Sequence, residues 1–168
     1  KNTEYKNLNL RKIDLDKELK INKILDHNIK NIAIIDYGMG NTQSLKNALE
    51  MLGFKSSLTN NISELDKSSL IALPGVGAFP EGVQRLKDIK LFDYLKNVAK
   101  KSKPIFGICL GMQLLFQKGT DEQTGLDIDG IGIIDGTCNK FVNTSKNNLP
   151  LPHIGFNKVI HQIGRAHV

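Results

Sequence analysis

The sequence predicts an α/β fold with an open, mostly parallel sheet and helices on both faces. Short apolar runs rich in β-branched residues, which buried parallel strands need, alternate with segments whose apolar residues recur at helical spacing. Glycine-rich turns follow two of these apolar runs. Strands that alternate with helices favour a parallel sheet with right-handed crossovers.

The composition is that of one folded domain: 168 residues, of which 40% are hydrophobic and 24% charged. No apolar stretch reaches the roughly 18–20 residues that a membrane-spanning helix needs, and the first residues lack a secretion-signal core. We therefore expect a cytoplasmic protein without a membrane partner. The net charge of +6 is shared between residues 1–30 and the rest of the chain, so no basic stripe indicates nucleic-acid binding.

The chain divides near residue 30. Residues 1–30 mix charged residues and Asn with scattered Leu and Ile, and we expect an N-terminal extension there, either a tail or a short amphipathic helix. From residue 31 the pattern changes to apolar runs and glycine-rich turns. Residues 31–168 are therefore expected to form the folded domain.

The first part of this domain has the pattern of a strand, a turn and a helix. The run NIAIID, residues 31–36, predicts a buried strand. The apolar residues of TQSLKNALEMLGF recur at helical spacing, and Gly53 is expected to end this helix. Between strand and helix lies the glycine-rich turn YGMGN, which comprises Tyr37, Gly38, Met39, Gly40 and Asn41.

Three further strands and one long helix are expected before the first cysteine. KSSLT, LIALP and PIFGI each predict a strand. Between the last two, a longer helix is expected from about Glu81 to Lys100, with Val83, Leu86, Leu95 and Val98 as its apolar residues.

Cys109 follows the last of these strands, in the sequence Gly107-Ile108-Cys109-Leu110-Gly111. Open α/β sheets bind ligands beyond the carboxyl ends of their strands. The pattern G-x-Cys-x-G is typical of a sharp strand-to-helix turn that exposes a nucleophile and needs small neighbours. A helix that begins here would also direct its partial positive charge at the sulfur and favour the nucleophilic thiolate. The alternative is a buried cysteine that acts as a small hydrophobic residue.

Two further features could complete a thiol site. Gln113, one helical turn beyond Cys109, could contact a substrate or be an ordinary surface glutamine. In PGVGAF, the glycines around Val76 allow backbone amides to turn toward a developing oxyanion, although alone the segment is an ordinary turn. Cys138 and Cys109 lack the spacing of a metal or redox site, so we expect no metal, cofactor or disulfide.

Four segments, in this order, carry a resemblance to a known family. They are NIAIIDYGMGNTQSLKNALEMLGF, LPGVGAFPEGVQRL, KPIFGICLGMQLLF and LPHIGFN, and they resemble the glutaminase subunits of imidazole glycerol phosphate synthase. These subunits are class I (triad) glutamine amidotransferases of histidine biosynthesis. The resemblance covers about residues 31–160 and implies a class I amidotransferase fold that is incomplete at its C-terminus.

The resemblance also implies roles for individual residues. Cys109 would attack the side-chain amide of glutamine, form a glutamyl thioester and release ammonia. The turn that contains Val76 and Gly77, together with the amide of Leu110, would form the oxyanion hole. Gln113 would help to hold the glutamine.

A partner is implied as well. The family passes ammonia to a (β/α)8-barrel cyclase subunit, which uses it to make imidazole glycerol phosphate and an aminoimidazole carboxamide ribotide. The turn from Tyr37 to Asn41 would face this subunit in a heterodimer.

The last part of the sequence departs from this family. The triad requires a His and a Glu from a motif of the F-H-P-E type, and residues 122–168 contain no such motif. His153 matches a family position upstream of the triad and is expected to be structural, and Phe156 stands where the family usually has Trp. A nucleophile without its general base loses roughly 10²–10⁴-fold in rate. We therefore expect these 168 residues alone to be inactive as a glutaminase.

Two alternatives stay open at the level of sequence. The first is a paralogous subunit that supplies ammonia for the amination of a surface-polysaccharide sugar, because the same four motifs would serve that chemistry. The second is a non-catalytic partner-binding fragment, which would require the triad residues to be absent from the natural protein too.

Overall fold

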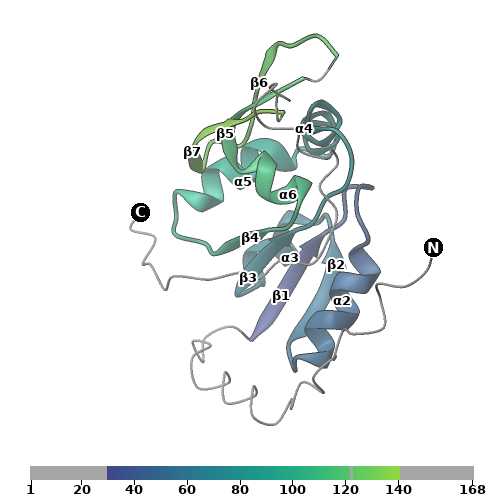
Figure 1. The fold of residues 1–168 in the computed structure, drawn as a ribbon. Coiled ribbons are helices and arrows are strands. Elements are labelled where there is room, and N and C mark those ends of the chain that lie inside the picture. The colour runs from purple at the N-terminus through teal and green to yellow at the C-terminus, as the bar shows by residue number, and fades with distance from the viewer. Residues whose placement is uncertain (1–29, 122, 141–168) are drawn as a thin grey trace, which may run out of the picture.

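The computed structural model describes residues 30–121 and 123–140, which form a parallel sheet with helices on both faces and a second, smaller sheet beside it (Figure 1). The predicted fold class is confirmed. The expected extension over residues 1–30 lies almost wholly outside the described residues, as do His153, Phe156 and the segment LPHIGFN. Of the helices in the described part, none is long and apolar enough to span a membrane.

The main sheet has four parallel strands in the order β2-β1-β3-β4. All four coincide with predicted runs and are short. Their carboxyl ends lie along one edge, because the pairing is parallel throughout. The strands are β1 Asn31–Ile35, β2 Lys55–Thr59, β3 Leu70–Leu73 and β4 Ile105–Gly107.

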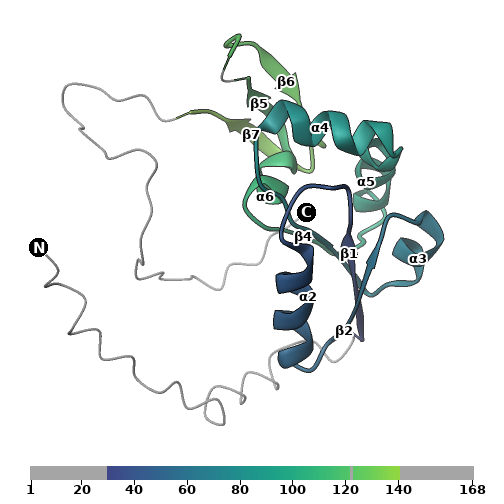
Figure 2. The ribbon, with the colours of Figure 1, turned by 90° about the vertical axis from the view of Figure 1, so that its right-hand side faces the viewer.

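Helices cover both faces of this sheet, and α2 and α3 lie on opposite sides of it (Figure 2). On one face, α2 packs its half-buried Leu45 and Leu49 against Ile32, Ile34 and Ala72. The other face holds the larger apolar core, to which the remaining helices contribute. The helices are α2 Thr42–Met51, α3 Ile62–Lys67, α4 Phe79–Asp88, α5 Leu91–Ala99 and α6 Leu110–Leu114.

The expectation of one continuous helix from Glu81 to Lys100 is wrong, because the chain breaks between α4 and α5. Lys90 adopts a left-handed conformation with φ of 62°. A straight helix that buries Val83 and Leu86 would turn Lys90 toward the core. The break shifts the helical phase by about one residue, so that Leu91, Phe92 and Leu95 become buried instead.

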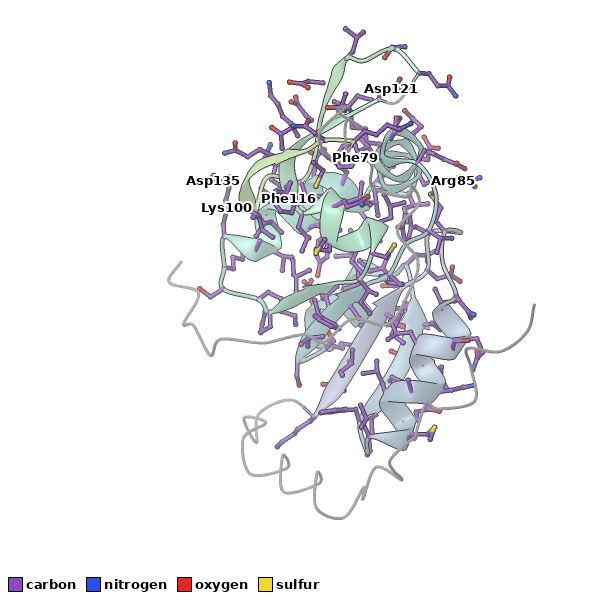
Figure 3. All side chains as sticks on the ribbon, viewed as in Figure 1. Phe79, Arg85, Lys100, Phe116, Asp121 and Asp135 are labelled. Carbon is purple, nitrogen blue, oxygen red and sulfur yellow. The ribbon has the colours of Figure 1, made fainter. Side chains whose placement is uncertain are left out.

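The second sheet has the order β6-β5-β7, with β5 Phe116–Thr120, β6 Asp127–Asp129 and β7 Ile134–Cys138. Strand β5 pairs antiparallel with β6 and parallel with β7. Phe79, labelled in Figure 3, lies at the start of α4. It packs so closely on Gly119 of β5 that a Cβ on this glycine would lie 2.6 Å from the ring. This contact joins the small sheet to the helical layer, and only glycine leaves room for it.

Candidate active site

Cys109 lies between β4 and α6, at the edge where the parallel strands end. The residue before it is fixed to the neighbouring strand, because the Ile108 amide donates a hydrogen bond of 3.0 Å to the carbonyl oxygen of Leu73. The Cys109 side chain is exposed. The structure therefore places an accessible thiol at the sheet edge, and Cys109 is not a buried core residue.

The backbone of Cys109 is strained, with φ of 54° and ψ of −120°. Among the described residues, positive φ outside glycine also occurs at Lys90 and Ser102. Such a conformation costs an L-residue about 1–3 kcal/mol and persists only where the surroundings impose it. The sharp strand-to-helix turn predicted from G-x-Cys-x-G is thus present.

The two glycines of this pattern are required by close packing. A Cβ on Gly107 would lie 2.6 Å from the Cα of Met112, and one on Gly111 would collide with the carbonyl oxygen of Leu73. Both neighbours are backbone atoms, which cannot move away by changing rotamer. The turn of residues 107–111, which we call the elbow, therefore packs tightly against β3 and the start of α6. This packing imposes the strain on Cys109.

The strain predicts an unusual effect of glycine at position 109. Because glycine adopts positive φ without steric cost, a Cys109→Gly chain should be more stable than a Cys109→Ala chain by about 1 kcal/mol. Elsewhere in folded elements glycine costs about 0.5–1 kcal/mol relative to alanine. Urea unfolding of the two variants measures the difference, and a less stable glycine variant would contradict strain at the elbow.

The loop after β3 lies directly against the elbow. The Leu110 amide donates a hydrogen bond of 3.3 Å to the carbonyl oxygen of Gly75. Val76 is 57% exposed, and Gly77 has φ of 112°. The structure thus bonds the Leu110 amide to Gly75, the residue before Val76 and Gly77, and the oxyanion role of Val76, Gly77 and Leu110 stays a prediction.

Gln113 lies in α6, one turn after Cys109, and its backbone amide donates a hydrogen bond of 3.1 Å to the backbone carbonyl of Cys109. The residue is half-buried. The backbone carbonyl oxygen of Gln113 accepts a weak hydrogen bond of 3.8 Å from the thiol of Cys138 in β7. Burial raises the pKa of the Cys138 thiol, so the two cysteines of the chain differ in both exposure and environment.

The turn from Tyr37 to Asn41, predicted to contact a partner, is only partly on the surface. Gly38 and Asn41 are exposed, whereas the side chains of Tyr37 and Met39 are buried in the core. Asn41 has a structural task as well, because its Oδ1 accepts a hydrogen bond of 3.1 Å from the Ser44 amide and caps α2. A partner contact by this turn stays a prediction, and the side chains of Tyr37 and Met39 are not available for it in this conformation.

Sequence reasoning did not assign the role that Tyr37 has here. Its hydroxyl donates a hydrogen bond of 2.8 Å to the Pro74 carbonyl oxygen, in the loop that lies against the elbow. The partners are far apart in sequence, and no local pattern signals the contact. No histidine occurs among the described residues around Cys109, because the four histidines of the chain lie outside residues 30–140.

Comparison with known proteins identifies the family to which this chain, with its parallel sheet and cysteine elbow, belongs. Residues 33–164 match the family model of class-I glutamine amidotransferases. A protein of Bacillus cytotoxicus named imidazole glycerol phosphate synthase subunit HisH is 41% identical over 128 residues, which make up 76% of this chain and 58% of that protein. A Bacillus cereus protein of the same name is equally similar. The chain thus spans about 58% of the length of these relatives.

Solved structures support the fold independently. A glutamine amidotransferase structure aligns with a TM-score of 0.53 at 16% identity and covers 64% of this chain and 55% of that one. A proposed peptidase E protein of Listeria monocytogenes also aligns with a TM-score of 0.53, at 15% identity, over 69% of both chains. The parallel sheet, the cysteine elbow and the match over residues 33–164 together lead to one conclusion: the chain belongs to the class-I glutamine amidotransferase family.

Proposed function

We propose that the protein containing this chain hydrolyses glutamine to glutamate and ammonia, with Cys109 as the nucleophile. The observation that carries the proposal is the exposed thiol of Cys109 at a strained strand-to-helix elbow, in a chain of the class-I glutamine amidotransferase family. The sulfur attacks the amide carbon of the glutamine side chain. The carbon–nitrogen bond then breaks, ammonia leaves after taking up a proton, and water hydrolyses the thioester to glutamate and the free thiol.

The loop after β3 is proposed to supply the oxyanion donors. In this structure the Leu110 amide is occupied by the Gly75 carbonyl, so this hydrogen bond must open before Leu110 can stabilise an oxyanion. Rotation of the peptide between Gly75 and Val76 would remove the carbonyl and present the Val76 amide in its place. Gln113, near Cys109 on the short helix α6, is proposed to contact the bound glutamine.

The 168-residue chain by itself should release almost no ammonia from glutamine. Proton transfer by a positioned base contributes about 10²–10⁴-fold, and no histidine occurs in the described residues around Cys109. We expect the rate to match that of Cys109→Ala in a coupled glutamate assay. A rate well above that of the alanine variant would show that a base is present, and His153→Ala would be the first variant to examine.

The ammonia is proposed to pass to a (β/α)8-barrel cyclase subunit in a heterodimer of histidine biosynthesis. The support is the name of the Bacillus relatives, which are called subunits of imidazole glycerol phosphate synthase. The carboxyl-end edge of the sheet carries the elbow, the loop after β3 and the turn from Tyr37 to Asn41. A partner that docks on this edge would cover the thiol and receive the ammonia directly.

Variants at Asn41 separate partner contact from helix capping. Asn41→Ser keeps a capping oxygen and should change the unfolding free energy by less than about 0.5 kcal/mol, whereas Asn41→Ala should cost about 1 kcal/mol. If Asn41 contacts the partner, both variants weaken binding to the barrel subunit about tenfold, equivalent to about 1.4 kcal/mol. Calorimetric titration measures the affinity. Unchanged affinity of the serine variant would show that Asn41 serves only as the cap.

Complementation tests the function as a whole. Residues 31–160 would be joined to the C-terminal part of the Bacillus cereus relative, and the chimera expressed in bacteria that lack their own glutaminase subunit of imidazole glycerol phosphate synthase. We expect growth without histidine from the chimera, and none from its Cys109→Ala variant. If a well-expressed, folded chimera does not support growth but still hydrolyses glutamine, the ammonia serves another pathway and the assignment to histidine biosynthesis is wrong.

A further inference from the structure

Tyr37 has a buried hydroxyl whose position suggests more than core packing. The residue follows β1 and is only 4% exposed. Its hydroxyl group donates a hydrogen bond of 2.8 Å to the carbonyl oxygen of Pro74, at the start of the loop after β3. The bond therefore joins the ends of two neighbouring strands at the edge where Cys109 lies.

The same hydroxyl also packs against Gly75, the next residue of the loop. A Cβ on Gly75 would collide with the Tyr37 hydroxyl oxygen and would lie 3.0 Å from both the Leu110 Cβ and the Gly111 amide nitrogen. Gly75 thus packs closely against both Tyr37 and the elbow. Its carbonyl oxygen accepts the hydrogen bond from Leu110, so the contacts run continuously from Tyr37 to the residue after Cys109.

We propose that Tyr37 is a positioning residue that fixes the loop of residues 74–77 against the elbow and thereby sets the geometry of the oxyanion donors. The inference rests on the proposed glutaminase function. With the Pro74 carbonyl held by Tyr37, the peptide between Gly75 and Val76 can rotate, once its hydrogen bond to Leu110 opens, without displacing the rest of the loop. Without the hydroxyl, the whole loop gains alternative conformations, and each of them draws population away from the arrangement that stabilises an oxyanion.

Tyr37 is suited to this task because it stays protonated. Burial, and to a smaller extent the charge of Cys109, raises the pKa of Tyr37 to about 12. The hydroxyl therefore remains a hydrogen-bond donor throughout the physiological range. Since the folded state favours the neutral form, this contribution to stability is complete below the ordinary tyrosine pKa of 10.0 and is lost as the pH rises toward 12.

The test uses Tyr37→Phe, which removes the hydroxyl and keeps the ring, and two reagents for Cys109. A chloroketone analogue of glutamine develops negative charge on its ketone oxygen during alkylation, whereas iodoacetamide reacts by direct displacement and needs no oxyanion donor. Loss of one oxyanion donor typically costs about 10²–10³-fold, so partial loss of its positioning should slow the chloroketone about tenfold. The iodoacetamide rate should stay within about twofold, because the thiol itself is unchanged.

Tyr94→Phe is the matched control. The Tyr94 hydroxyl donates a hydrogen bond of 2.8 Å to Asp66 of helix α3, which is not part of the elbow or of the loop after β3. Removal of this hydroxyl should change neither alkylation rate. If Tyr37→Phe slows both reagents equally, or slows neither, Tyr37 is only a core residue and the proposal is wrong.

Amide exchange gives a second readout that does not depend on glutaminase chemistry. In the wild-type chain the Leu110 amide is bonded to Gly75 and should exchange slowly. Tyr37→Phe should speed this exchange at least about tenfold relative to core amides of β1. Glutamine should also slow the alkylation of Cys109 in the wild-type chain, and if it does not, the proposed function is wrong. Unchanged exchange of the Leu110 amide in Tyr37→Phe would instead overturn the positioning role.

Discussion

Replacement of Gly111 by alanine is expected to lower the free energy of unfolding by about 3 kcal/mol, one of the largest effects for any single methyl group added to this chain. The added Cβ would collide with the Leu73 carbonyl oxygen and would lie 2.7 Å from the Leu73 carbonyl carbon. These atoms belong to the backbone of β3, which is paired on both sides within the sheet. Relief of the clash therefore requires α6 to move away from the sheet or β3 to lose pairing.

Chemical denaturation measures this loss, with Gly125→Ala as the control. A methyl group on Gly125 would have no other atom within 4 Å, so its substitution should cost only the strain of its φ of 70°, about 1 kcal/mol. If Gly111→Ala proves no more destabilising than Gly125→Ala, the close packing of the elbow on β3 is not a source of stability.

Cys109→Ser is expected to abolish covalent labelling by a chloroketone analogue of glutamine, with a fall in rate of at least about 100-fold. The exposed thiol of Cys109 lies at the elbow, whereas Cys138 is half-buried, donates to the Gln113 carbonyl and has a raised pKa. A hydroxyl is a far weaker nucleophile than a thiolate at neutral pH. Intact-mass spectrometry over time measures the labelled fraction.

Two comparisons make this result specific. Cys138→Ser should be labelled at the wild-type rate, and excess glutamine should protect Cys109 while glutamate protects less. Equal labelling of Cys109→Ser and wild type would show that another residue reacts, and Cys109 could then not be the nucleophile. If Cys109 is labelled and glutamine does not protect it, the thiol is reactive but the chain shows no glutamine site.

Strands β1, β3 and β4 of the main sheet could be predicted because each is a local apolar run bounded by turn residues, as in NIAIID and LIALP. Strand β2, with the sequence KSSLT, was predicted as well although it is mostly polar. The elbow was equally visible, since G-x-Cys-x-G after such a run has few structural interpretations. The break at Lys90 was not predicted, because apolar residues on both sides of it keep an approximate helical spacing. Helix α3 and strands β5 and β6 were missed as well, since they are short and only partly apolar.

The sequence by itself determined the family, the order of the main strands along the chain and the position of the proposed nucleophile, because all three follow from contiguous residues. Only the tertiary structure decided that Tyr37 is buried, that its hydroxyl holds Pro74, and that Leu110 donates to Gly75. These contacts join segments that are distant in sequence and meet only because the order β2-β1-β3-β4 places the ends of β1, β3 and β4 side by side. Hydrogen bonds between such segments follow no local period, so they emerge only when the sheet is assembled.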